Sequence, residues 1–166
     1  MAYSSPRTWT TDEEVTAAML NQEIRDNIGA IAPVGAAAWT DYTPTLTQSA
    51  TVSKTITYAR YMKVGRMVTV NVLLTCTSSG TAANHIEVGL PLAAVSSAAF
   101  VVGTFHVYNS SGPNHFVGAC YFWSTTSVAC VTNNNSHYLG ETSSAFASAI
   151  GSGDIVSISL TYESAS

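Results

Sequence analysis

The chain has 166 residues, a formal net charge of −4 and only 10% charged residues. Its length predicts about one domain with a core of its own, and its few dispersed basic residues argue against binding driven by nucleic-acid phosphates. No apolar run approaches the roughly 20 residues that span a bilayer, so no membrane segment is expected. The N-terminus lacks the charged and apolar blocks of a signal peptide, and we expect synthesis in the cytoplasm.

Charge is distributed unevenly along the chain. Residues 7–26 carry seven charged side chains, whereas the much longer stretch 42–166 carries eight. A globular domain normally has about a quarter charged residues, so the second stretch is typical of a body packed into a larger assembly. We therefore divide the chain into an N-terminal anchor segment, 1–38, and a β domain, 39–166.

The anchor segment has the pattern of an amphipathic helix over about residues 12–28. Thr11 and Glu14 have the spacing of a capping box, and Gly29 with Pro33 would end the helix. Apolar residues recur every three or four positions along one stripe: Ala17, Leu20, Ile24, Ile28 and Ile31.

The stripe has two interpretations, packing on its own domain or packing on sister chains or a larger partner. An Ala- and Gly-rich linker over residues 30–38 favours the second, because it would tether the helix loosely. Trp9, just ahead of the helix, is of the residue type that anchors interfaces. The expected partner-binding set is Trp9, Ala17, Leu20, Ile24, Arg25 and Ile28.

From Trp39 onward the helical period disappears and alternation with a period of two predicts strands. The runs 56–62 and 67–76 flank a short loop in which Gly65 can take a left-handed conformation. One face of the second run is the expected core: Val68, Val70, Val72, Leu74 and Cys76. Further runs alternate with turn sequences, at 85–90, 100–108, 116–123, 127–132, 137–141 and 154–162. The predicted fold class is mainly β, an antiparallel jelly-roll-like β-sandwich preceded by one N-terminal α-helix.

The three cysteines, Cys76, Cys120 and Cys130, have no metal-ligand spacing. Buried free thiols are one interpretation. The other is a disulfide, because a three-residue loop centred on Thr125 would place Cys120 directly opposite Cys130 on neighbouring strands.

Catalytic motifs are missing from the sequence. The histidines His85, His106, His115 and His137 are dispersed, and no nucleophile elbow, phosphate-binding loop or dinucleotide fingerprint occurs. Asp154 and Glu141 could form a carboxylate pair, but Asp154 follows Gly-Ser-Gly and has the character of a turn residue. We expect a protein that is not an enzyme and uses no cofactor or metal.

Aromatic and amide side chains near the predicted strand ends suggest a sugar-binding surface, because rings stack on sugars and amides bind hydroxyls. Core aromatics and turn asparagines explain the same positions without a ligand, and both interpretations stay open. The candidate glycan-facing residues are Tyr108, His115, Tyr121, Trp123, His137 and Tyr138.

Several segments, in this order, resemble virion structural proteins of tailed bacteriophages, particularly phages of actinobacteria. The resemblance to their leaders lies in Pro6-Arg-Thr-Trp9, Glu14-Val-Thr-Ala-Ala18, Leu20-Asn21 and Ile24-Arg-Asp-Asn27. The chain is then similar to β-rich modules of tail fibres and capsid appendages in Trp39-Thr-Asp-Tyr-Thr-Pro-Thr45, Ala59-Arg-Tyr-Met-Lys-Val-Gly-Arg66, Gly89-Leu-Pro91 and Gly153-Asp-Ile155.

The resemblance implies a homotrimeric surface appendage of the virion, assembled in the host cytoplasm. A short tail fibre or receptor-binding-type protein would contact tail or baseplate proteins through its N-terminal helix and a host surface glycan through its β domain. The alternatives are a capsid decoration or head-fibre protein on the shell, and a free lectin-like glycan-binding module.

Overall fold

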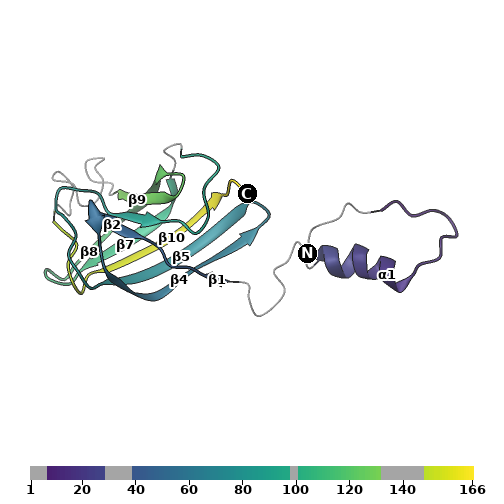
Figure 1. The fold of residues 1–166 in the computed structure, drawn as a ribbon, viewed down its shortest axis with the longest axis horizontal. Helices are drawn as coiled ribbons and strands as arrows, with labels where there is room; N and C mark the ends of the chain where they lie inside the picture. The colour runs from purple at the N-terminus through teal and green to yellow at the C-terminus, as the bar shows by residue number, and fades with distance from the viewer. Residues whose placement is uncertain (1–6, 29–38, 98–100, 132–147) are drawn as a thin grey trace. The chain divides into compact units, whose positions relative to one another are not determined.

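The computed structural model describes residues 7–28, 39–97, 101–131 and 148–166. Contacts within the chain divide it into two compact units, Met1–Ala38 and Trp39–Ser166. The described part of the first unit contains one helical stretch after a non-helical segment, and that of the second is built from strands (Figure 1). Ile31 and the linker over residues 30–38 lie outside the described residues.

The helix of the first unit starts later than predicted. It begins with α1 (Ala17–Leu20) and continues directly into η1 (Asn21–Asp26), which is wound as a π-helix. In a π-helix each backbone hydrogen bond spans one residue more than in an α-helix. The start is therefore at Ala17 and not near Asp12.

The capping box predicted at Thr11 and Glu14 is wrong. Thr16 is the N-cap, and its Oγ1 accepts from the Met19 N–H at 3.3 Å. Thr10 and Glu13 instead close a turn, in which the Thr10 N–H donates to Glu13 Oε2 at 3.1 Å. Asp12, inside this turn, has a φ of 62°, and a left-handed residue cannot begin a right-handed helix.

The second unit is an antiparallel sheet, with ten strands among the residues that the structure describes. Their order across the sheet is β1-β4-β5-β10-β7-β8-β9-β6-β2-β3. The bounds are β1 (Thr40–Asp41), β2 (Leu46–Gln48), β3 (Ala50–Thr51), β4 (Lys54–Val64), β5 (Met67–Cys76), β6 (Glu87–Gly89), β7 (Val101–Asn109), β8 (Asn114–Ser124), β9 (Ser127–Val131) and β10 (Ile155–Glu163).

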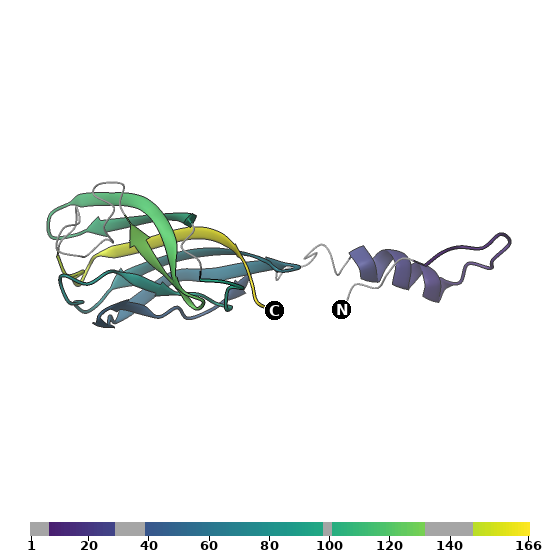
Figure 2. The same cartoon turned by 90° about the horizontal axis from the view of Figure 1, so that it is seen from above.

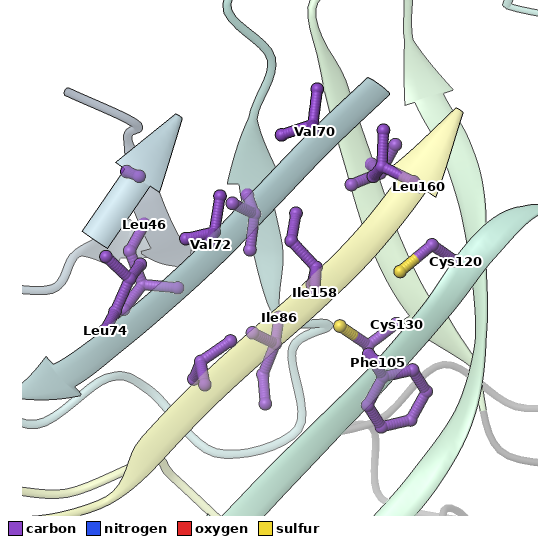
Figure 3. Close-up of a cluster of buried hydrophobic side chains, with 14 of the residues drawn as sticks. Leu46, Val70, Val72, Leu74, Ile86, Phe105, Cys120, Cys130, Ile158 and Leu160 are labelled. Atoms are coloured by element: carbon purple, nitrogen blue, oxygen red, sulfur yellow. The ribbon is translucent and has the colours of Figure 1, made fainter. Parts of the chain in front are cut away.

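The sheet curls, so that strands far apart in its order share one core (Figures 1 and 2). Leu46 of β2 and Leu74 of β5 belong to the same buried cluster as Phe105 of β7 and Ile158 of β10 (Figure 3). Burying a Val, Leu or Ile side chain contributes about 1.5–3 kcal/mol each, so this shared cluster stabilises the curled form of the sheet.

The prediction of a mainly β, antiparallel chain is confirmed. Every residue of the expected core face of β5, from Val68 to Cys76, is at most 1% exposed. Gly65 has a φ of 60° in the turn between β4 and β5, as the hairpin prediction requires. The short strands β1, β2 and β3 were not predicted, and the predicted strand 137–141 lies outside the described residues.

The prediction that Cys120 faces Cys130 is also confirmed. The two residues are direct partners in the β8–β9 ladder, and both side chains are buried. The loop between the strands has two residues, Thr125 and Thr126, instead of three. All three cysteines are free thiols in the structure, so the alternative of a disulfide is not adopted (Figure 3).

Candidate functional site on the outer face of β7, β8 and β10

Alternation along β7, β8 and β10 separates a core side from an outer side. Phe105 and Val107 of β7 point into the core, so their neighbours in the strand lie on the opposite face. The ladder places the partners of those neighbours on the same face. We call this set, together with Tyr121 at the next alternate position of β8, the outer face: Thr104, His106, Tyr108, His115, Val117, Ala119, Tyr121, Ile155, Ser157 and Ser159.

The outer face contains an open depression of about 560 Å³. Its floor is low because Thr104, Ala119, Ser157 and Ser159 are small side chains. Val117 stands beside it with 67% of its surface exposed, and Val101 is also exposed. None of the outer-face residues is Asp, Glu, Lys or Arg, so the surface offers hydroxyl, imidazole and apolar groups without formal charge.

Glycine is required at two positions beneath this depression. A Cβ on Gly118 would lie 2.7 Å from Cε1 of Phe105, whose ring packs over the glycine from the partner position in β7. A Cβ on Gly103 would lie 2.2 Å from the backbone oxygen of Ser159 in β10. Such distances are below any normal contact, so β7 approaches both neighbours closely only because these residues lack side chains.

Three rings form a row on the outer face near the β7–β8 turn. His106 Nε2 lies 2.8 Å from His115 Nδ1, which is a hydrogen bond between the two imidazoles. The Tyr108 ring is 4.9 Å from the His115 ring, centroid to centroid. Tyr108 and His115 are direct partners in the ladder, so the hairpin register brings the row together.

The structure brings some of the candidate glycan-facing residues together and separates another. Tyr108, His115 and Tyr121 lie on the outer face, with Tyr121 paired to Val101 at the far end of β7. Trp123 instead packs on His85, with ring centroids 3.9 Å apart. His137 and Tyr138 lie outside the described residues.

Sequence reasoning left His106 out of the candidate set. The signal was present, because the turn over residues 109–113 fixes Tyr108 opposite His115, and alternation then puts His106 on the same face. The Asn109 side chain has a structural role in this turn. Its Oδ1 accepts from the N–H groups of Ser111 and Gly112, each at 3.0 Å.

Asp154 is a structural carboxylate at the start of β10. Its side chain is buried, and Oδ1 accepts from the Ser110 N–H at 2.8 Å and from Ser110 Oγ at 2.9 Å. Oδ2 accepts from the Gly151 N–H at 2.9 Å. The carboxylate therefore ties the β7–β8 turn to the loop before β10, while Glu141, its suggested catalytic partner, lies outside the described residues.

The buried thiols and phenols have the properties of core groups. Burial, with the nearby Asp154 carboxylate, raises the pKa of the Cys76 thiol to about 11. A hydrogen bond with Cys120, together with burial, raises the pKa of Cys130 well above its ordinary value. Nucleophilic cysteines need a lowered pKa, so neither Cys76 nor Cys130 is an activated thiol.

Among the described residues, no group of three or more His, Cys, Asp or Glu side chains is arranged to hold a metal ion. In the same part of the chain, no helix has the length and apolar character needed to cross a membrane. No protein-family model, curated protein or solved structure matches the chain.

Proposed function

We propose that the chain is a non-enzymatic structural component of a bacteriophage virion, a homotrimeric surface appendage attached by its N-terminal helix. The observation that carries this proposal is the exposure of the helix's apolar stripe. Leu20, Ile24 and Ile28 are 45–53% exposed, and Trp9 ahead of the helix is 44% exposed. Large apolar side chains left half in water favour a role in contacting a partner.

The spacing of the apolar residues supports the same role. Residues four apart lie on the same face of a helix. Leu20, Ile24 and Ile28 therefore form a line along one face of the helix. A helix this short is marginally stable in water, so binding a partner through the line would stabilise it.

The finer fold assignment belongs to this proposal. We take the curled sheet to be a jelly-roll-like sandwich, in which β1-β4-β5-β10-β7-β8 forms one layer and β9-β6-β2-β3 forms the other. Both layers contribute to the buried cluster, since Val88 of β6 and Val72 of β5 are members of it. The uncharged outer face lies on the first layer and would be displayed by the appendage.

The proposal is tested in particles of the phage that encodes the chain, by quantifying the protein in purified virions. Leu20→Ser with Ile24→Ser should strongly reduce incorporation, because both side chains would contact the sister chains or the virion protein to which the helix binds. Val15→Ser is the matched control, since Val15 is equally exposed at 52% but precedes the helix. Wild-type incorporation of the double variant, or of a chain lacking residues 1–38, would overturn the attachment role.

The row of rings on the outer face favours a second candidate function, binding of a glycan. Tyr108 and His115 provide ring faces, and Ser157, Ser159 and Thr104 provide hydroxyls around the depression. A glycan array with the purified chain tests this function, with Tyr108→Ala expected to remove the signal. Trp123→Ala should retain the signal because Trp123 lies away from the row. An array with no signal for the wild type would rule out glycan binding and leave the structural role as the single proposed function.

A further inference from the structure

We propose that His106 and His115 form a two-histidine site for a borderline divalent metal ion of the Zn²⁺ type. The inference is independent of the virion role proposed above. It starts from the geometry of the imidazole pair, in which Nε2 of His106 and Nδ1 of His115 are 2.8 Å apart.

The two rings face each other edge to edge. Their planes differ by only 13°, and their centroids are 5.0 Å apart. The centroid separation exceeds the distance between the two nitrogens by about two ring radii. The two nitrogens therefore lie on the line between the centroids, and their in-plane lone pairs point at each other. A single shared proton lies between them when both rings are neutral, because one nitrogen donates and the other accepts.

A metal ion can replace that proton once the two rings tilt, because the two nitrogens now point straight at each other and a tetrahedral ion binds its ligands at about 109°. Zn–N distances of about 2.0–2.1 Å in a tetrahedral site place two ligand nitrogens about 3.3 Å apart. The observed distance has to widen by roughly half an ångström, and each ring has to tilt by about 35° toward the ion, which rotation of the His106 and His115 side chains would supply. The ion would hold two protein ligands and complete its coordination with water, because His115 is exposed to solvent.

The backbone holds the pair in place before any ion binds. His106 is the ladder partner of Val117 and His115 is the partner of Tyr108, so the histidines are diagonal neighbours on one face of a long hairpin. The Tyr108 ring packs against His115 and limits its rotation. A preformed pair loses less conformational entropy on binding than two free side chains would.

The surroundings define the class of ion. Neutral imidazole suits Zn²⁺, Ni²⁺ and Cu²⁺, whereas Mg²⁺ and Ca²⁺ prefer carboxylate and carbonyl oxygens. The outer face has no Asp or Glu carboxylate to favour Mg²⁺ or Ca²⁺, and no Lys or Arg whose charge would repel a cation.

Isothermal titration of the untagged full-length chain with Zn²⁺ near neutral pH tests the site. One Zn²⁺ per chain is expected, with no heat from Mg²⁺. His106→Gln and His115→Gln should each weaken binding by at least about tenfold, since even the loss of outer-shell partners costs about 10–100-fold. His85→Gln is the matched control and should bind as the wild type, because His85 packs on Trp123 away from the pair.

Nuclear magnetic resonance of the histidine rings supplies a second readout on the unsubstituted protein. Zn²⁺ should shift the resonances of two of the four imidazoles, those assigned to His106 and His115. Binding that persists unchanged in both Gln variants, shifts confined to His85 or His137, or the absence of Zn²⁺ binding would each overturn the site.

Discussion

Asp154 shows how one buried polar side chain can organise two loops. Its carboxylate accepts three hydrogen bonds from Ser110 and Gly151, which belong to segments distant in sequence. Burial of a carboxylate is tolerated only when such partners are in place. The same residue had suggested a catalytic pair in the sequence, and its hydrogen bonds explain its position without catalysis.

Replacing Asp154 by Asn should lower the free energy of unfolding by about 2–3 kcal/mol. An amide can no longer accept from every donor, and hydrogen bonds to a charged group contribute about 1.5–3 kcal/mol. Urea unfolding measures the change. Asp41→Asn, at an exposed position of the edge strand β1, should stay within about 0.5 kcal/mol, and equal losses in both variants would contradict the structural role.

The raised pKa of Cys76 predicts a loss of stability at alkaline pH. The ordinary thiol pKa is 9.0 and the folded value is about 11, so the folded chain holds this proton more tightly than the unfolded chain does. The contribution is fully present below pH 9 and is lost as the pH rises through 11, because the unfolded thiol ionises first.

Urea unfolding under reducing conditions from pH 7 to 11 measures this loss. Cys130, Tyr42 and Tyr162, whose pKa values are also raised in the folded chain, add declines of their own that remain as background in the variant. Cys76→Ala should make the fall between pH 9 and 11 shallower. An identical fall in the wild type and the variant would show that Cys76 has no part in it.

At the scale of elements, the close pairing of β7 with β10 depends on Gly103. A Cβ there would meet the Ser159 backbone oxygen at 2.2 Å and the Leu160 Cβ at 2.4 Å. Gly103→Ala should therefore cost about 1–3 kcal/mol or more, as overpacking does. Gly151→Ala is the control, because a Cβ there meets nothing within 4 Å; equal thermal stability of the two variants would contradict the close approach.

The long strands could be predicted from the sequence, whereas the two-residue strands β1 and β3 could not. β5 alternates over ten residues, and Gly65 marks the turn before it, so period and turn agree. The strands β1 and β3 have two residues each. β1 pairs with a segment distant in sequence, Tyr61 opposite Thr40, and β3 pairs with the three-residue strand β2. Two residues carry no measurable period, so only the folded sheet identifies them.

The predicted start of the helix was wrong for a comparable reason. Two Thr/Glu pairs at capping-box spacing, Thr10 with Glu13 and Thr11 with Glu14, lie ahead of the actual N-cap Thr16. The local pattern favoured an early start, but the left-handed Asp12 diverts the backbone into a turn.

Half of the candidate site could be predicted from local sequence, because the register of the β7–β8 hairpin places Tyr108 opposite His115. The depression could not be predicted in this way, because it depends on β10 lying beside β7.

At the scale of the whole molecule, the proposed function separates two tasks. The N-terminal unit presents a line of half-exposed apolar side chains for assembly. The β unit buries a continuous core and leaves an uncharged outer face with a depression and a histidine pair. The central claim is that the chain works as an assembled appendage, and that the helix makes the assembly.

The mass of the purified full-length chain in solution tests this claim most directly. One chain weighs 17.4 kDa, and light scattering after gel filtration should give three times that mass. The chain carrying both Leu20→Ser and Ile24→Ser should give the mass of a single chain while keeping the thermal unfolding of its β unit. A single-chain mass for the wild type, or an unchanged trimer in the double variant, would contradict assembly through the helix.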